Sequence, residues 1–214
     1  AKEVERLLSK CRFKTLNLST KDVTDILDAL SPSEANHLFG VLRTFFNWCE
    51  RRELIEQSPI RKLTKPHKEN SRKRVLTPDE IKAVWKSTAT EQSFDRIVRI
   101  CLLLAVRRGE AAAIQSDWLQ GDTLVVPATH TKNKHELILP LTPGAYRLVA
   151  SHAAASSRQS QRTWSKPKAA LDARSGVTNW VLHDLRRSVA SHISAPPISA
   201  PPHLVDRLLN HKSS

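Results

Sequence analysis

Residues 122–140 read DTLVVPATHTKNKHELILP, and this stretch decides the fold class of the chain. Two apolar runs, DTLVVPA and ELILPL, flank the polar run THTKNK. Apolar runs on either side of a polar turn are typical of a β-hairpin. The stretch therefore predicts two antiparallel strands in the middle of the sequence.

Helices are predicted on both sides of this hairpin. Apolar residues recur at helical spacing after Thr20-Lys21-Asp22, while Ser31-Pro32-Ser33-Glu34 and Thr77-Pro78-Asp79-Glu80 have the capping-box pattern of a helix start. Further helices are expected at 94–105, after Thr142-Pro143-Gly144, and at 164–174, 183–193 and 202–210, with a surface loop at 153–162. The predicted fold class is mainly α with a small β-hairpin or sheet (α+β).

A basic segment separates the helical first third from the rest of the chain. Residues 61–74, RKLTKPHKENSRKR, contain almost no apolar side chains. This composition indicates a solvated linker, and the sharper alternative is a linker that lies along DNA, with Arg72, Lys73 and Arg74 as contacts. The domains are accordingly placed at 1–66 (helical), 67–74 (basic linker) and 75–214 (second domain).

The overall charge indicates a polyanionic partner. The 214 residues carry a net charge of +13, so nucleic acid is the first candidate and an anionic membrane surface the second. No apolar run approaches the roughly 18 residues of a membrane span, and no stretch resembles a signal peptide. The three scattered cysteines include no CxxC pair, which argues against a disulfide framework or a zinc site and fits a reducing cytoplasm.

The first motif with chemical potential is Arg107-Arg108-Gly109-Glu110, which follows an apolar helical run. An arginine at the end of a buried helix costs desolvation free energy unless it is paired. Taken alone, the motif indicates a surface ion pair between Arg107 and Glu110, which are three residues apart.

The second motif is His183-Asp184-Leu185-Arg186-Arg187. His183 and Arg186 share one helical face, where an imidazole can exchange a proton and a guanidinium can hold charge by bidentate contact. This combination suits a phosphate group. An ordinary basic helix start is the simpler interpretation, and a metal site through His183 and Asp184 has no support from a cluster of further ligands.

The third candidate is the lysine pair of the hairpin turn, Lys132 and Lys134. A lysine in a turn is ordinarily a solvated residue. On a short hairpin, however, it can reach into a neighbouring groove.

Taken together and in order, these motifs resemble the tyrosine recombinase family. The similarity runs through RRGE, the TKNK…LPL hairpin, HDLRR and LLNH, and it covers nearly the whole chain. SDW at 116–118, WSK at 164–166, AALD at 169–172, FFNW at 45–48 and IEQSP at 55–59 resemble the prophage and genomic-island integrase branch. The resemblance implies a helical, SAM-like core-binding domain, incomplete at its N-terminal end, followed by an integrase catalytic domain.

The resemblance also implies roles for individual residues. The implied catalytic residues are Arg107, Lys132, His183, Arg186 and His211, although Lys134 lies close enough to be confused with Lys132. Glu110 resembles the acidic residue that braces the first arginine. Arg108 and Arg187 match no catalytic position and are expected to contact phosphate or to pack. The residues expected to bind DNA are Arg72, Lys73, Arg74, Lys134 and Arg187.

Two departures from the family pattern stand out. Leu104-Ala105-Val106 occupies the place where Thr-Gly is usual, which affects helix packing more than chemistry. The nucleophilic tyrosine of the family follows the LxxH helix by about ten residues or more, whereas this sequence ends three residues after His211. Tyr146 is far from the expected position and is interpreted as structural. The nucleophile is therefore expected to be absent from these 214 residues, and the chain alone is expected to be inactive.

The function implied by the resemblance is site-specific DNA recombination for prophage or genomic-island integration and excision. A tyrosine hydroxyl attacks a phosphodiester and forms a 3′-phosphotyrosyl bond, which conserves bond energy, so no cofactor, ATP or metal is required. The implied partners are double-stranded DNA attachment sites, a homotetramer on DNA, and accessory DNA-bending or directionality proteins, with no membrane. The expected location is the cytoplasm of a bacterium, associated with the nucleoid.

Two other functions stay open at this stage. A decayed or truncated integrase would be a non-catalytic DNA-binding protein. A type IB topoisomerase would share the chemistry without exchanging partner strands, although the integrase-like first domain argues against it.

Overall fold

The computed structural model describes residues 5, 6, 8, 9, 11, 18–69, 72–89, 91–156 and 164–210. The chain folds as two compact units, residues 1–72 and residues 73–214. The boundary between Arg72 and Lys73 lies within the basic segment. Each unit has its own hydrophobic core, so each is described by itself.

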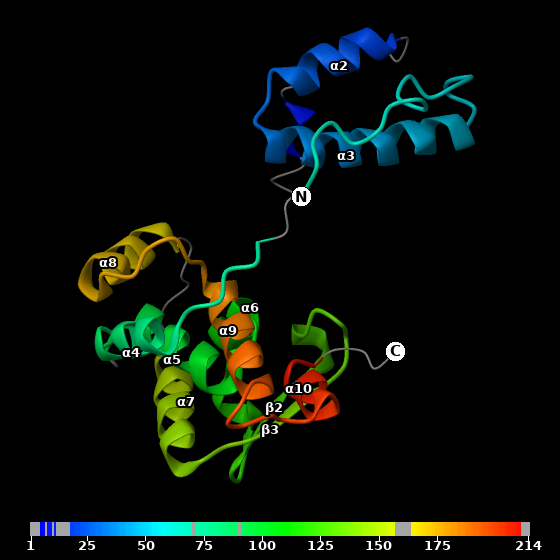
Figure 1. Cartoon of the computed structure of the whole chain (residues 1–214). Helices are drawn as coiled ribbons and strands as arrows, with labels where there is room; N and C mark the ends of the chain where they lie inside the picture. The colour runs from blue at the N-terminus through cyan, green and yellow to red at the C-terminus, as the bar shows by residue number, and fades with distance from the viewer. Residues whose placement is uncertain are drawn as a thin grey trace. The chain divides into compact units, whose positions relative to one another are not determined.

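The first unit is built on two helices, α2 (Thr20–Asp28) and α3 (Pro32–Arg51), which lie against each other (Figure 1). Their buried residues recur every three or four positions, so each helix presents one apolar face to the other. The core of the unit consists of Val23, Leu27, Ala35, Leu38, Phe39, Leu42, Phe46 and Ile60. Ile60 comes from the irregular segment after α3, which thereby folds back onto the helix pair.

The starts of these two helices differ in detail from the predictions. Ser19 caps α2 with a reciprocal box, because its hydroxyl accepts from the Asp22 amide at 3.2 Å and its own amide donates to Asp22 Oδ2 at 2.8 Å. At α3 the predicted capping box is wrong, although Ser31 is the N-cap. The Ser31 hydroxyl donates to Glu34 Oε2 at 2.9 Å instead of accepting from the backbone.

The second unit contains most of the helices. They are α4 (Pro78–Lys86), α5 (Ser93–Leu104), α6 (Arg108–Ala113), α7 (Pro143–Ser156), α8 (Ser165–Ser175), α9 (Leu182–Ser194) and α10 (Pro202–Leu208). Helix α5 contacts α6, α7, α8 and α9 and is buried over most of its surface, which explains its nearly continuous apolar sequence. The Thr77–Glu80 capping box predicted for α4 is confirmed.

The predicted hairpin is confirmed as two strands of a small antiparallel sheet. Strand β2 (Thr123–Val126) pairs with β3 (Leu137–Pro140), and β1 (Leu119–Gln120) adds the other edge, in the order β1-β2-β3. Alternate residues of β2 and β3 are buried against the core, as strand geometry requires. The α+β fold class predicted from sequence is therefore confirmed. Strand β1 was not predicted, because two residues are too short to show a period.

The surface loop predicted at 153–162 is wrong in its first part. Helix α7 continues to Ser156, and Ala153 lies in the core of the second unit. Alanine has the highest helix propensity of all residues, so the Ala-rich stretch extends the helix. The rest of that prediction, residues 157–162, lies outside the described residues.

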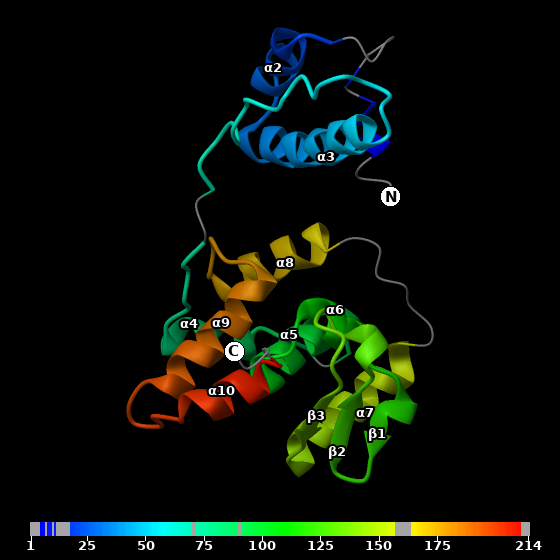
Figure 2. The same ribbon diagram turned by 90° about the vertical axis from the view of Figure 1, so that its right-hand side faces the viewer.

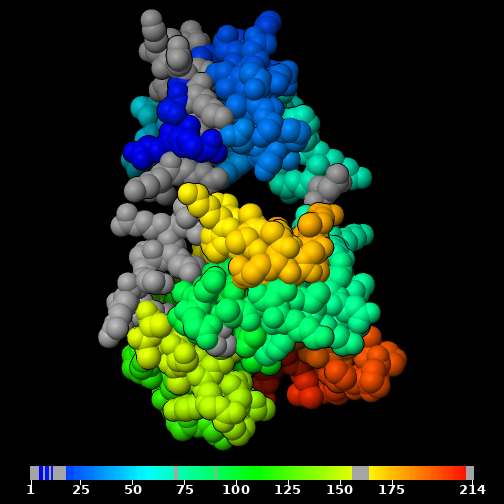
Figure 3. Space-filling model, turned by 90° about the vertical axis from the view of Figure 1, so that its left-hand side faces the viewer, coloured from blue at the N-terminus to red at the C-terminus, as the bar shows by residue number. Residues whose placement is uncertain are grey.

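Two peripheral helices matter for the site. Helix α8 covers the surface beside α4 and also contacts α5 (Figure 3). Helix α10 runs next to α9 (Figures 1 and 2) and forms a small apolar cluster with Ala105, Val205 and Leu209 at its centre. Helices α9 and α10 thus meet the end of α5 at one place.

Adjacent phenylalanines allow a test of the core of the first unit. Phe46 is 0% exposed, whereas Phe45 is 40% exposed. We expect Phe46→Ala to lower the free energy of unfolding of this unit by about 3–5 kcal/mol, and Phe45→Ala by about 1 kcal/mol or less. Hydrogen exchange of amides in α3 and α5 measures both units at once. Loss of protection in α5, or equal effects of the two substitutions, would contradict the assignment.

Candidate active site

Four segments of the second unit line one pocket of about 490 Å³. They are the start of α6, the turn between β2 and β3, and the facing ends of α8 and α9. The lining residues are Arg107, Arg108, Gly109, Lys132, Trp164, Ser165, Lys168, Val181, Leu182 and His183. Among these residues four carry a full positive charge and none carries a negative one, so the pocket favours an anion.

Arg107 is held at the entrance to α6 by a single carboxylate. Glu110, which is 3% exposed, accepts from the Arg107 backbone amide at 2.8 Å and from Arg107 Nη1 at 2.7 Å. The ion pair predicted from the spacing is therefore present, but its placement at the surface is wrong, because the Glu110 side chain is buried. Because one carboxylate binds both backbone and guanidinium, the remaining donors of Arg107 keep a fixed direction.

Arg186 lies behind the pocket and does not belong to its lining. It is 4% exposed, its Nη1 donates to the carbonyl oxygen of Ala105 at 2.5 Å, and its Nη2 donates to that of Leu209. Burial, and then the neighbouring charge of Arg107, lowers the pKa of Arg186 to about 10. The guanidinium is still charged at neutral pH, so two positive groups lie close together in a site where an anion would stabilise both.

His183 is exposed at the first turn of α9 and lines the pocket. Partial removal of its imidazole from water, together with the charges of Arg187 and Arg186, lowers the pKa of His183 below its usual value. The imidazole is therefore neutral at pH 7 and can accept a proton. Asp184 acts in the opposite direction but does not reverse the shift.

Lys132 reaches the pocket from the turn between β2 and β3. Thr131 fixes the start of this turn, because its hydroxyl lies 2.7 Å from the carbonyl oxygen of His135 and 3.1 Å from that of Ala128. Lys134 has a φ of 58° in the left-handed region and is exposed. Of the two lysines, the structure places Lys132 and not Lys134 in the lining.

Among the lining residues that were not predicted as site residues, Arg108, Trp164 and Lys168 make specific side-chain contacts. The Arg108 guanidinium carbon lies 5.1 Å from the centre of the Trp164 ring. Lys168 Nζ lies 2.5 Å from Asp172 Oδ1 and 3.9 Å from the centre of the Trp180 ring. In the sequence, Trp164 was noted only as part of the WSK motif of the resemblance. The ion pair of Lys168 with Asp172 could have been predicted from their i,i+4 spacing.

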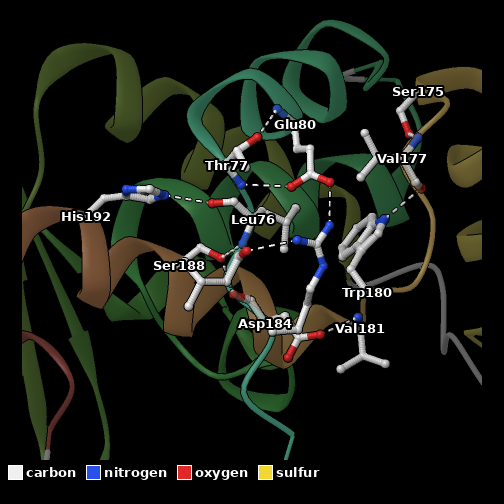
Figure 4. Close-up of polar contacts among 12 residues, drawn as sticks. Leu76, Thr77, Glu80, Ser175, Val177, Trp180, Val181, Asp184, Ser188 and His192 are labelled. Carbon is white, nitrogen blue, oxygen red and sulfur yellow. Dashed lines mark hydrogen bonds and ion pairs between the residues drawn. The ribbon is translucent and has the colours of Figure 1, made fainter.

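Helix α9 is fastened to the segment that enters the second unit (Figure 4). The buried amide of Leu76 donates to the Ser188 hydroxyl at 2.8 Å, and the Leu76 carbonyl oxygen lies 2.7 Å from His192 Nε2. Asp184, one turn before Ser188, accepts from the Val181 amide at 3.0 Å and from Arg187 Nη1 at 2.6 Å. One face of α9 thus binds the chain entering the unit, and its N-terminal end presents His183 to the pocket.

The residues predicted to contact DNA have different environments. Arg72, Lys73 and Lys134 are exposed, whereas Arg74 pairs with Glu80 and Arg187 with Asp184.

The remaining residues singled out in the sequence are His211, the only tyrosine and two cysteines. His211 lies outside the described residues, and its predicted role stays a prediction. Tyr146 is on α7, partly exposed, and does not line the pocket. Cys49 and Cys101 are buried thiols, as predicted, and burial raises the pKa of Cys101 to about 12.

Within the described part of the chain, no three His, Cys, Asp or Glu side chains form a group that could hold a metal ion. None of the described helices is both long and apolar enough to cross a membrane.

Comparison with known proteins gives a match at the level of structure alone. No family model and no curated protein matches the chain. Its structure is similar to that of a lambda integrase dimer bound to a COC′ core site, with a TM-score of 0.74 and 15% identity over 99% of this chain and 87% of that chain. A Tn1549 transposon integrase in complex with circular intermediate DNA gives a TM-score of 0.67 and 11% identity over 99% of this chain and 84% of that chain. A XerH site-specific recombinase bound to palindromic difH substrate gives a TM-score of 0.63 and 16% identity over 95% of this chain and 69% of that chain. The fold implied by the sequence resemblance is therefore confirmed.

The contact between Leu76 and Ser188 leads to a prediction about stability. We expect Ser188→Ala to lower the free energy of unfolding of the second unit by about 1–3 kcal/mol, because the buried Leu76 amide loses its acceptor. Ser194→Ala is the matched control: it lies on the same helix but is exposed, and should change stability by about 0.5 kcal/mol or less. Urea denaturation measures the free energy of unfolding of both variants. Equal effects would show that the Leu76 contact contributes nothing.

The environment of His183 leads to a prediction about its titration. We expect Arg187→Ala to raise the pKa of His183 toward its usual value, because a nearby positive charge is removed. The same histidine binds fewer protons in the folded chain than in the unfolded chain near pH 6, so its contribution to stability declines as the pH falls through this range. An NMR titration, with the signal assigned by His183→Gln, measures the pKa directly. Arg147→Ala, on α7, should leave it unchanged, and an unchanged value in Arg187→Ala would contradict the electrostatic account.

Proposed function

We propose that this chain, which has the fold of the tyrosine recombinases, belongs to a site-specific recombinase that cuts and rejoins DNA. The observation that carries the proposal is the meeting of Arg107, Lys132 and His183 in one basic pocket, from segments far apart in the sequence. A lambda integrase, a transposon integrase and a XerH recombinase of the same fold are bound to DNA in their structures. The net charge of +13 supports the same partner for this chain.

The two arginines stabilise the negative charge of the scissile phosphate, Arg107 by direct contact and Arg186 through its charge. In the transition state the phosphorus has five ligands, and negative charge builds up on its non-bridging oxygens. Arg107, with its direction fixed by Glu110, donates to these oxygens from the pocket wall. Arg186 adds positive charge from behind, where its own pKa is lowered to about 10 by burial and by Arg107. An anionic phosphate relieves the repulsion between them.

The histidine and the lysine move protons. His183 is neutral at pH 7 because its pKa is lowered, so it accepts the proton of the attacking tyrosine or orients the phosphate. Lys132 protonates the 5′-oxygen as it leaves, because an unprotonated alkoxide is a poor leaving group. A 3′-phosphotyrosyl bond forms in this step, and a 5′-hydroxyl of the partner strand later reverses it. His211 is assigned a hydrogen bond to a phosphate oxygen.

The nucleophile is assigned to a tyrosine outside these 214 residues. Tyr146 is the only tyrosine of the chain and does not line the pocket. The 214-residue chain therefore binds DNA without cutting it.

The first unit and the basic segment supply further DNA contacts. Residues 1–66 form the core-binding domain, and Arg72 and Lys73 contact the phosphate backbone from the linker. Lambda integrase has also been seen as a tetramer bound to a Holliday junction, and the complete protein is assigned the same assembly on its attachment sites. Integration and excision of a prophage or genomic island, in a bacterial cytoplasm and with accessory bending proteins, is the corresponding biological role.

Relaxation of supercoiled plasmid in EDTA tests this function without knowledge of the target site. We expect the complete gene product to relax plasmid in steps and to form a covalent adduct with DNA. Arg107→Ala should reduce the rate by about 10²-fold or more, because a donor to the transition-state oxygens is lost. Arg147→Ala is the control, since this exposed arginine lies outside the pocket.

The outcomes separate the possible functions. Tight, salt-sensitive binding without relaxation or adduct would overturn the catalytic assignment and leave a protein that only occupies DNA. Relaxation without synapsis of two specific sites would indicate a topoisomerase instead. Relaxation that is insensitive to Arg107→Ala would place the chemistry elsewhere.

A further inference from the structure

Two asparagines join the Lys132 turn to the end of α10. Asn133 Nδ2 donates to the Asn210 carbonyl oxygen at 2.5 Å. In return, Asn210 Nδ2 donates to Asn133 Oδ1 at 3.3 Å and to the His135 carbonyl oxygen at 3.1 Å. The two residues are 77 positions apart, and three hydrogen bonds link their segments.

The backbone at this contact explains the choice of asparagine. Asn210 has a φ of 46°, in the left-handed region that asparagine tolerates better than most residues other than glycine. A glycine there would fit the backbone but supply no side chain. Asn133 and Asn210 are both half-buried, so their hydrogen bonds are partly shielded from water.

The end of α10 is itself anchored in the site. Arg186 donates to the carbonyl oxygen of Leu209, the residue before Asn210. Leu209 and Val205 pack on Ala105, which accepts from the same guanidinium. The hairpin turn, in contrast, runs for ten residues between β2 and β3, from 127 to 136, with Thr131 as its main internal anchor.

We infer that Asn133 and Asn210 are positioning residues that hold the turn against α10 and thereby direct Lys132 into the pocket. Lys132 precedes Asn133 directly, so its backbone cannot move far while the asparagine contact is intact. The docking of the turn stands on the geometry alone. Its effect on DNA cleavage rests on the proposed function, in which Lys132 protonates the leaving oxygen.

Hydrogen exchange on the 214-residue chain tests the docking without any assumption about activity. The Lys134 amide donates to the Thr131 carbonyl oxygen at 3.3 Å and reports on the turn. We expect Asn133→Ala and Asn210→Gly to speed exchange of this amide about tenfold, because each removes hydrogen bonds that hold the turn. The amides that pair β2 with β3 should be unaffected. Asn179→Gly is the matched control, because Asn179 also has a positive φ (54°) but lies before α9.

Plasmid relaxation by the complete protein tests the effect on Lys132. We expect Asn133→Ala and Asn210→Gly to slow relaxation about tenfold, with duplex binding changed less than about twofold and Asn179→Gly at the wild-type rate. A residue that acts through Lys132 has nothing left to position once the lysine is removed. The double variant Lys132→Ala/Asn133→Ala should therefore be no slower than Lys132→Ala, whereas a general loss of structure would add a further decrease.

These readouts distinguish failure of the inference from failure of the proposed function. Unchanged Lys134 exchange in both asparagine variants overturns the docking. Faster exchange with wild-type relaxation, or an additive loss in the double variant, overturns the positioning role and leaves the recombinase proposal intact. If the wild-type protein relaxes no plasmid, the proposed function fails and the positioning role fails with it, while the exchange result still decides the docking.

Discussion

The buried guanidinium of Arg186 is the interaction on which the rest of the site depends. It bonds to the carbonyl oxygens of Ala105, at the end of α5, and Leu209, at the end of α10. This guanidinium, which belongs to α9, therefore holds the C-terminal ends of α5 and α10 next to α9. A buried charge is costly to leave without partners, so any displacement of these helices is opposed by the loss of its hydrogen bonds. Arg107, the N-cap of α6, follows Ala105 by two residues, so this junction also positions Arg107.

The same junction explains why the pocket selects an anion. Glu110 compensates the charge of Arg107, but it also uses part of that arginine's hydrogen-bonding capacity to fix its direction. The charges of Arg107, Arg186 and Arg187 all disfavour protonation of His183, which keeps the imidazole neutral at pH 7. The free protein thus maintains an excess of positive charge that a phosphate group reduces. The same arrangement of arginines therefore favours a bound phosphate and keeps His183 able to accept a proton.

Sequence patterns predicted the elements well where the signal was local. The Thr77 capping box, the apolar run of α5 and the alternation in β2 and β3 are each visible in a few neighbouring residues of the sequence. The end of α7 was missed because alanine is common in both loops and helices, and only packing of Ala153 in the core decides between them. The grouping of Arg107, Lys132 and His183 was predicted through family resemblance. The wall formed by Trp164 and Lys168, and the contact of Asn133 with Asn210, depend on long-range packing that no single motif encodes.

The anchoring of each pocket group matches the chemistry assigned to it. Groups that hold charge need fixed directions, and Arg107 and Arg186 are bound by buried partners. A group that delivers a proton to a leaving oxygen must follow an atom that moves during the reaction, and Lys132 lies on a turn. A turn of this length needs a restraint that can be released at low cost, and neutral hydrogen bonds between amides are weaker than ion pairs. The asparagine contact, made of neutral hydrogen bonds, is a restraint of this kind.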